Sequence, residues 1–224
     1  MTGKFITFEG VEGCGKSTQI RLIAEHLRSQ GYELVLTREP GGTVVGERIR
    51  SVLLDSAHKG IAPITELLLY AAARNQHVEE VLLPALKAGK LVLCDRYADA
   101  TTAYQGAARN IDPTIIKDIH RIATEGLNPD FTVLLDLPAK DGLARARDRN
   151  LRDASSAKED RFEQEDIAFH ERVREGYLAI AKEEPNRFAI VDARGSEEEV
   201  HKKITEAMET FLGLNSKHQM TNSK

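Results

Sequence analysis

Short apolar segments alternate with longer segments of helical periodicity along most of the chain. Five of the apolar segments have the length of β-strands: residues 4–8, 33–37, 91–94, 131–136 and 188–191. The last three are nearly continuous apolar runs, which is typical of parallel strands that are buried on both faces. This alternation predicts an α/β fold of three layers (α/β/α), with a five-stranded parallel sheet surrounded by helices.

Two helices have clear signals of their own. Residues 16–30 carry apolar side chains at helical spacing, and Gly31 follows as a residue suited to end a helix. Ser196 and Glu199 have the spacing of a capping box, which predicts the start of another helix. The core-facing stripe of that helix consists of Val200, Ile204, Ala207, Met208 and Phe211.

Two segments depart from this regular pattern. Residues 145–161 (RARDRNLRDASSAKEDR) are charged and have little apolar content, which predicts a mobile excursion from the fold. The polar residues at the C-terminus predict a frayed tail over 214–224. No linker divides the rest, so we expect one domain over residues 1–213.

Composition and charge argue against several classes of protein. The apolar share of 41% and the charged share of 29% are those of an ordinary soluble protein. The apolar runs are too short to cross a bilayer, and we detect no secretory signal. We therefore expect no membrane partner. Cys14 and Cys94 form no metal-binding or disulfide pattern, so we expect unpaired thiols in the cytoplasm. The net charge of −4 argues against broad nucleic-acid binding.

The glycine-rich segment after the first predicted strand matches the phosphate-loop pattern G-x-x-x-x-G-K-[ST]. Glycines allow a tight turn whose N–H groups point at an anion, and the helix that follows adds its positive end. Lys16 can reach the β- and γ-phosphates and the Ser17 hydroxyl can bind Mg²⁺. The segment predicts a P-loop NTPase fold that binds ATP through Gly10, Val11, Glu12, Gly13, Cys14, Gly15, Lys16, Ser17 and Thr18.

Asp95 and Arg96 follow the third predicted strand, at the edge where open parallel sheets bind ligands. Asp95 could orient Mg²⁺ or the attacking phosphate, and Arg96 could hold a phosphate through two N–H groups. A surface ion pair is the simpler alternative for an isolated Asp-Arg pair. The chain has no N-K-x-D segment to read guanine, which argues against a small GTPase and in favour of a kinase.

Five motifs together resemble the thymidylate kinase family over nearly the whole chain. They are FEGVEGCGKST (8–18), TREPGGT (37–43), LLLYAAARNQH (67–77), DRYADATTAYQGAAR (95–109) and DRFEQE (160–165). The resemblance implies ATP- and Mg²⁺-dependent phosphorylation of dTMP to dTDP, and a homodimer. It implies no partner beyond these nucleotides and a second copy of the chain.

The resemblance also implies roles for individual residues. Glu12 occupies the position that contacts the 3′-hydroxyl of the sugar, Tyr70 the position that stacks on thymine, and Arg74 the position that bonds the base. Tyr104 matches a ring that crowds the 2′ position and so favours deoxyribose. The other residues implied around dTMP are Pro40, Arg96, Thr101 and Gln105. Ala100 departs from the family, which often has Ser there.

Residues 145–161 match the lid of this family. Members without an arginine in the phosphate loop have arginines in the lid, and this loop has Glu12 and no arginine. Arg145, Arg147, Arg149 and Arg152 lie in the segment, and the prediction names Arg149 first and Arg147 second as the cation of the transition state. Glu163 matches an acidic position near the acceptor or the metal, where it would join Ser17 and Asp95.

Two other functions stay open at this point. A kinase of the same fold could act on another nucleotide or nucleoside, because fold alone does not determine the substrate. A regulator could bind ATP without transferring phosphate. Lys16, Ser17, Asp95 and Arg96 together with the lid arginines favour an active kinase, whose catalytic residues would be Lys16, Asp95, Arg96, Arg149 and Arg147.

Overall fold

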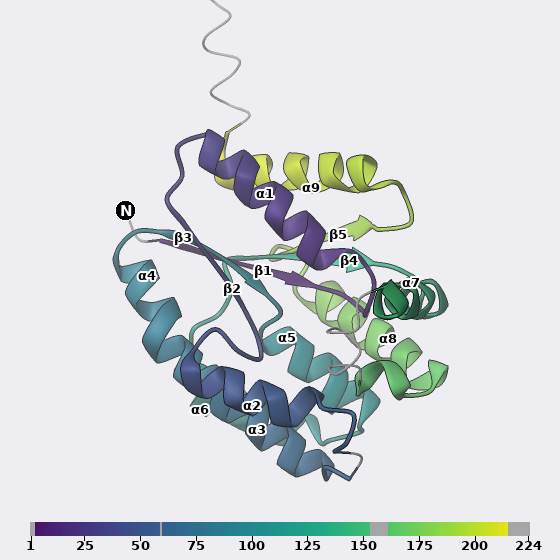
Figure 1. Ribbon diagram of the computed structural model, residues 1–224. Helices are drawn as coiled ribbons and strands as arrows, with labels where there is room; N and C mark the ends of the chain where they lie inside the picture. The colour runs from purple at the N-terminus through teal and green to yellow at the C-terminus, as the bar shows by residue number, and fades with distance from the viewer. Residues whose placement is uncertain (1–2, 59, 153–160, 215–224) are drawn as a thin grey trace, which may run out of the picture.

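The computed structural model describes residues 3–58, 60–152 and 161–214 (Figure 1). Five strands form one parallel sheet in the order β2-β3-β1-β4-β5. The predicted sheet is confirmed, and each predicted strand end lies within one residue of the observed end. The strands are β1 (Lys4–Glu9), β2 (Leu34–Arg38), β3 (Leu91–Asp95), β4 (Phe131–Asp136) and β5 (Phe188–Asp192).

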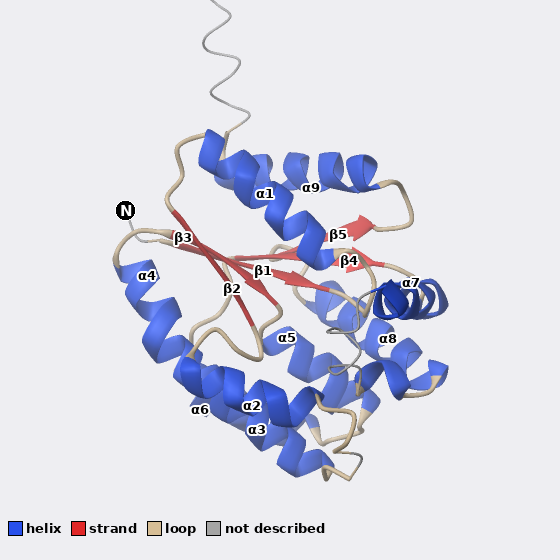
Figure 2. Ribbon diagram, in the orientation of Figure 1, coloured by secondary structure: helices blue, strands red, loops and turns tan. Residues whose placement is uncertain are grey.

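Helices cover both faces of the sheet, so the predicted three-layer fold is also confirmed (Figure 2). Helices α1 (Lys16–Ser29) and α9 (Glu197–Leu212) lie side by side on one face. The capping box of Ser196 and Glu199 is formed at the start of α9. The remaining helical segments are α2 (Val44–Leu54), α3 (Pro63–His77), η1 (Val78–Leu82), α4 (Leu83–Lys87), α5 (Ala98–Thr101), η2 (Thr102–Ala108), α6 (Pro113–Thr124), α7 (Ala139–Arg152), η4 (Phe162–Gln164) and α8 (Ile167–Glu183).

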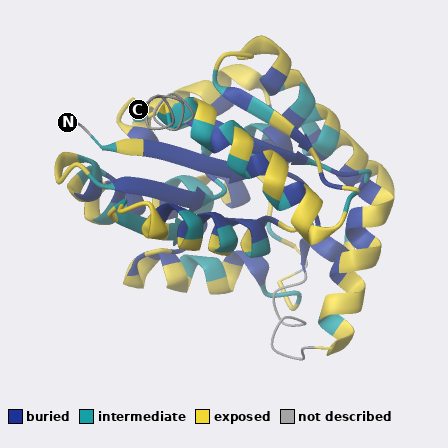
Figure 3. Ribbon diagram, turned by 90° about the horizontal axis from the view of Figure 1, so that it is seen from above, coloured by how far each residue is buried: buried dark blue, intermediate teal, exposed yellow. Residues whose placement is uncertain are grey.

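The core lies on the central strands. Strands β1, β3 and β4 are buried over nearly their whole length, whereas the edge strands β2 and β5 are partly exposed (Figure 3). The register pairs Phe8 of β1 with Asp95 of β3, so the ends of these strands lie next to each other. The loops that leave β1 and β3 therefore meet at the carboxyl edge of the sheet, where ligands bind in folds of this kind.

The charged segment predicted as an excursion begins as regular helix. Residues 145–152 form the last two turns of α7, whose buried stripe consists of small residues and Leu143. The rest of the predicted lid, 153–160, lies outside the described residues. The predicted tail lies outside them as well, except for Leu214, whose N–H donates to Glu209 O at the end of α9.

Cys14 and Cys94 are buried and form no disulfide with each other, as the sequence predicts. Within residues 3–58, 60–152 and 161–214, no helix combines the length and the apolar content that a bilayer span requires.

Candidate active site

A cavity of about 550 Å³ opens at the carboxyl edge of the sheet, between the phosphate loop and helices α3, η2 and α7. Seven basic and four acidic side chains of the described residues line it. This excess of cations suits an anionic ligand. The lining includes residues 12–18 of the phosphate loop, while Gly10 and Val11 complete the loop from below.

The phosphate loop is held in shape by glycine and by Lys16. Gly10, Gly13 and Gly15 have φ values of 140°, 68° and 96°, which favour glycine. A Cβ on Gly13 would also lie 2.1 Å from Gly142 O of α7, so the loop and this helix are in backbone contact. Lys16 Nζ donates to Gly10 O at 2.9 Å and to Val11 O at 3.0 Å. The ammonium group therefore spans the loop at the start of α1.

Ser17 and Asp95 meet beside this loop. Ser17 Oγ donates to Asp95 Oδ2 at 3.2 Å. Asp95 Oδ1 is buried and has no hydrogen-bond partner within the described part of the chain. One hydroxyl and one carboxylate fit Mg²⁺, which keeps most of its water and phosphate ligands rather than being enclosed by protein. In the same part of the chain no group of three or more His, Cys, Asp or Glu side chains could hold a metal.

Glu12 lies at the centre of a polar cluster. Its Oε1 accepts from Arg96 Nη2 at 3.1 Å and from the Tyr104 hydroxyl, and its Oε2 lies 3.1 Å from His170 Nδ1. The Arg96 guanidinium lies over the Tyr104 ring at 4.9 Å. Burial opposes the charge of Glu12, but the His170 hydrogen bond and the Arg96 and Lys16 charges outweigh it and hold its pKa far below the ordinary value. Glu12 is thus an acceptor only.

Arg96 is supported from beneath by two buried residues. Its Nη1 donates to the Tyr177 hydroxyl at 3.0 Å, and that hydroxyl donates to Glu9 Oε2 at 2.7 Å. The Tyr97 N–H donates to Glu9 Oε1 at 2.7 Å. Burial, followed by the charge of Asp99, raises the pKa of Glu9 to about 8. Arg96 itself has a φ of 69°, a conformation uncommon for residues other than glycine.

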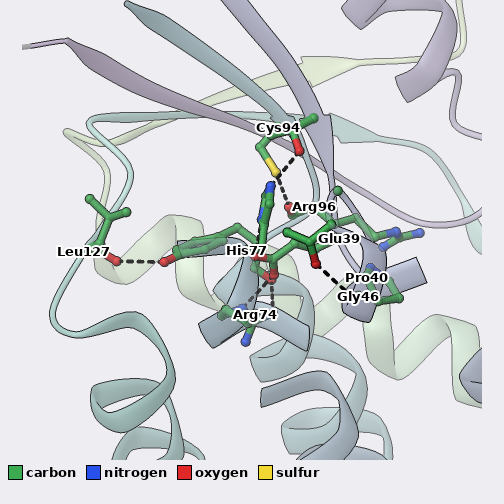
Figure 4. A network of polar contacts seen from close by, with 12 residues as sticks. Glu39, Pro40, Gly46, Arg74, His77, Cys94, Arg96 and Leu127 are labelled. Carbon is green, nitrogen blue, oxygen red and sulfur yellow. Dashed lines mark hydrogen bonds and ion pairs between the residues drawn. The ribbon is translucent and has the colours of Figure 1, made fainter. Parts of the chain in front are cut away.

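Arg74 and its partners form the opposite wall of the cavity (Figure 4). Arg74 is 2% exposed, and its Nε donates to Glu39 Oε2 at 2.7 Å. Its two other nitrogens donate to Thr101 Oγ1 at 3.0 Å and to Tyr97 O at 2.9 Å. Glu39 Oε1 also lies 3.0 Å from His77 Nδ1. These contacts fix the guanidinium group in one place, with its Nη atoms toward the two ends of α5.

The other residues predicted around an acceptor meet in the same cavity. Tyr70 lies one helical turn before Arg74 on α3, and Tyr104 and Gln105 face it from η2. The remaining predicted residues of the lining are Pro40, Thr101 and Glu163. Ala100, the departure from the family pattern, lines the cavity too.

Helix α7 presents two arginines to the cavity, and they are not the pair named from the sequence. Arg145 and Arg149 line it, because a spacing of four residues puts them on one face of the helix. Arg147, the second candidate named from the sequence, is not among the described residues that line the cavity. Arg145 Nη1 donates to Ala193 O at 3.1 Å.

Glu163 lies at the far side of the cavity, bound to the end of α7. Arg149 Nη2 donates to its Oε1 at 2.6 Å, and Asn150 Nδ2 donates to its Oε2 at 2.5 Å. The structure therefore pairs Glu163 with an arginine of α7 rather than with the hydroxyl and carboxylate of Ser17 and Asp95.

Two residues of the site, His170 and Arg50, escape the sequence reasoning, and a third, Arg145, is named in the lid but is not chosen as a cation of the transition state. His170 is 1% exposed on the buried face of α8, where a lone histidine in an apolar stripe was the available signal. Arg50 of α2 lines the cavity and donates to Pro40 O at 3.0 Å, but no motif marks it. Arg145 could have been preferred to Arg147 from its four-residue spacing to Arg149.

A sequence model described as thymidylate kinase matches residues 8–204. The chain belongs to the thymidylate kinase family. It is 53% identical to the thymidylate kinase of Geotalea uraniireducens over 206 residues, which are 92% of this chain and 96% of the relative. It is 53% identical to that of Trichlorobacter lovleyi over 210 residues, covering 94% of this chain and 99% of the relative.

Membership of the thymidylate kinase family is supported by the fold as well. A crystal structure of thymidylate kinase from Ehrlichia chaffeensis superposes with a TM-score of 0.74 at 32% sequence identity. The superposition covers 93% of this chain and 100% of the solved chain. The family resemblance predicted from five separate motifs is thereby confirmed.

Proposed function

We propose that this chain transfers the terminal phosphate of ATP to dTMP and releases ADP and dTDP. The observation that carries the proposal is one cavity that is lined both by the phosphate loop and by Arg96, Tyr70 and Arg74. Such a cavity holds donor and acceptor together, which converts transfer between two molecules into a step within one complex. The names of the relatives supply the acceptor.

The donor binds at the phosphate loop. Backbone N–H groups of residues 10–18 and the start of α1 hold its phosphates, and Lys16 pairs with the β- and γ-phosphates. Ser17 and Asp95 would hold Mg²⁺, in part through water, and the ion would supply positive charge beside the phosphate oxygens. Asp95 Oδ1, which has no protein partner among the described residues, is the atom left for that water shell.

The acceptor binds opposite the loop. Glu12 accepts a hydrogen bond from the 3′-hydroxyl, and Arg96 and Arg50 hold the phosphate of dTMP. Tyr70 offers its ring to thymine and Arg74 donates to the base. Tyr104, whose hydroxyl contacts Glu12, occupies the space that a 2′-hydroxyl would need. Pro40, Thr101 and Gln105 complete the pocket.

The transfer needs no strong general base. A phosphate monoester loses its second proton with a pKa of about 6, so the attacking oxygen of dTMP is already ionised near neutral pH. That oxygen forms a bond to the γ-phosphorus while the bond from phosphorus to the bridging oxygen of ADP breaks. Arg149 and Arg145 of α7 stabilise the charge on the transferred group, and Lys16 and Arg96 fix the two phosphates in line.

A panel of acceptors tests the proposal. ADP release is measured with ATP and dTMP, dUMP, dCMP, dGMP or AMP, and dTMP is expected to give the highest kcat/KM. Preference for another acceptor would favour a different nucleotide kinase of the same fold. ATP binding with no turnover on any acceptor would favour a non-catalytic regulator.

A homodimer in the cytoplasm is part of the proposal. Helices α2, α3 and α6 lie next to one another and expose apolar side chains, which suits an interface between two copies (Figure 1). Sedimentation should give about twice the chain mass of 24.9 kDa, and Leu68→Asp should shift it to one chain mass. A monomer at all concentrations would contradict the dimer. The exposed apolar side chains of this surface are Val52, Ile64, Leu68, Ile115 and Ile122.

A further inference from the structure

Glu66 is a buried carboxylate behind the acceptor end of the cavity. It belongs to α3, and its side chain is 1% exposed. Glu66, Tyr70 and Arg74 recur every four residues, so they lie along one face of this helix. Glu66 does not line the cavity itself, and neither the motifs nor the proposed reaction gives it a role. Burying a carboxylate charge is costly unless oppositely charged and hydrogen-bonding side chains compensate it.

The partner that reaches the cavity is Gln105 of η2. Gln105 Nε2 donates to Glu66 Oε1 at 2.7 Å, and Gln105 is 1% exposed. A carboxylate only accepts hydrogen bonds, so the amide nitrogen of Gln105 must face Glu66. The group that Gln105 can offer to a ligand in the cavity is therefore its carbonyl oxygen.

Two arginines compensate the charge of Glu66. Arg161 Nη2 lies 2.7 Å from Glu66 Oε2, and Arg109 approaches both carboxylate oxygens at 3.4 Å. Because a guanidinium group can only donate, both arginines favour the charged, accepting form of Glu66. The charged Glu66 carboxylate, which can only accept hydrogen bonds, thus sets the orientation of the Gln105 amide.

Arg74 and Gln105 both line the cavity, so the proposed base site has one donor from Arg74 and one acceptor from Gln105. A pyrimidine with two carbonyl groups, such as thymine, presents an acceptor at O4 next to a donor at N3–H. Cytosine presents the reverse, a donor at N4 next to an acceptor at N3. The Arg74 donor and the Gln105 acceptor complement thymine. Against cytosine, Arg74 would meet the N4 donor and the Gln105 carbonyl would meet the N3 acceptor.

We propose that Glu66 is a positioning residue that makes this kinase select thymine over cytosine by fixing the Gln105 amide with its carbonyl group toward the base. The inference rests on the proposed acceptor site. It concerns selection between bases, whereas the proposed function concerns the transfer itself, so the two can fail separately.

Glu66→Gln tests the inference because it keeps the shape and removes the acceptor-only character. Arg161 can only donate, so the new amide should turn its oxygen to Arg161 and its NH₂ group to Gln105. Gln105 then turns its carbonyl to position 66 and its NH₂ group to the cavity. We expect the ratio of kcat/KM for dTMP over dCMP to fall by about tenfold or more.

Arg109→Gln is the matched control. It weakens the same buried cluster but leaves the hydrogen bond between Glu66 and Gln105, so the dTMP/dCMP ratio should stay at the wild-type value. Glu66→Gln in a Gln105→Leu background should likewise leave the ratio of that background unchanged. A ratio unaltered by Glu66→Gln, or altered equally by Arg109→Gln, overturns the role of Glu66. A wild-type chain without dTMP turnover would instead overturn the proposed function.

A complex of the wild-type chain with dTMP tests the same point without any variant. The expected structure keeps Gln105 Nε2 on Glu66 and places the Gln105 carbonyl oxygen within hydrogen-bond distance of N3. A complex in which Gln105 leaves Glu66, or turns its nitrogen to the base, overturns the inference even if Glu66→Gln does not fold.

Discussion

At the scale of single residues, the chemistry of the site depends on which partners each side chain keeps. Glu12 is surrounded by the donors of Arg96, Tyr104 and His170, so near neutral pH it can accept a hydrogen bond but has no proton to donate. His170 also contacts Phe162 O through Nε2 at 3.0 Å. It therefore joins the phosphate loop to the short helix η4.

His170→Phe should weaken acceptor binding more than donor binding. The ring loses its hydrogen bond to Glu12, which then has fewer contacts to hold it toward the 3′-hydroxyl. We expect KM for dTMP to rise about tenfold, with KM for ATP within about twofold of wild type. His26→Phe is the control, because it changes a histidine of α1 that contacts Glu209 of α9. Equal changes in both KM values would contradict this role of His170.

Glu9 should make stability depend on pH in a predictable direction. Its pKa is raised from 4.5 to about 8 in the folded chain, so the folded state holds a proton that the unfolded state loses above pH 4.5. The contribution of Glu9 to stability is therefore complete below pH 4.5 and declines as the pH rises toward 8, by about 1.4 kcal/mol per pH unit at most.

Glu9→Gln removes this titration. Denaturant unfolding of the variant and the wild type at pH 5.5 and pH 8 should show the wild type losing stability relative to the variant as the pH rises. A constant difference between the two proteins at both pH values would show that Glu9 is ionised throughout this range.

At the scale of elements, helix α7 lies against the phosphate loop. A Cβ on Gly142 of α7 would lie 2.4 Å from Glu12 O, so the helix backbone rests on the loop. The same helix carries Arg145 and Arg149 into the cavity. Movement of α7 relative to the loop would therefore change both the shape of the loop and the position of these two arginines.

Arg149→Ala should lower kcat by about a hundredfold or more while raising KM for dTMP much less, because the charge it stabilises is largest in the transition state. Arg147→Ala is the matched control: it removes an equal charge from the same helix but from the exposed side, so kcat should stay near wild type. A change confined to KM in Arg149→Ala would remove this arginine from the transition state.

Gly142→Ala should separate α7 from the phosphate loop. The added methyl group must displace the backbone of Glu12, which should cost about 1–3 kcal/mol and lower Tm by several degrees. KM for ATP should rise as well. Gly60→Ala, where a Cβ meets nothing within 4 Å, should change neither quantity. Wild-type values for Gly142→Ala would show that the contact can relax freely.

The periodicity of the sequence predicts the strands and helices α1 and α9, because each has a continuous apolar run or stripe. It did not predict α7 as a regular helix, since the buried face of that helix consists mostly of alanine and glycine and the rest is charged. The phosphate loop has no apolar pattern either, but it can be predicted because all the residues of its motif are consecutive in the sequence. The four-residue spacing that groups Arg145 with Arg149 becomes evident once this segment is known to be helical.

At the scale of the whole molecule, the order of the sheet creates the site. Strands β1 and β3 are neighbours although β2 lies between them in sequence, and this places Asp95 beside the phosphate loop. Contacts such as Glu12 with His170 and Glu66 with Gln105 join segments 158 and 39 residues apart. No local pattern encodes which of these partners meet. His170 and Glu66 could therefore not be predicted. Asp95 and Arg96 could, because they directly follow a predicted strand and belong to a family motif.

The transfer of label from ATP is the most direct test of one cavity that holds donor and acceptor together. The wild-type chain is incubated with Mg²⁺, dTMP and ATP labelled at the γ-phosphate. We predict that the label appears in dTDP in step with ADP formation, with little inorganic phosphate, because dTMP and not water should occupy the position in line with the γ-phosphate. Label found mainly in inorganic phosphate, or ATP bound with no labelled dTDP, would contradict the account.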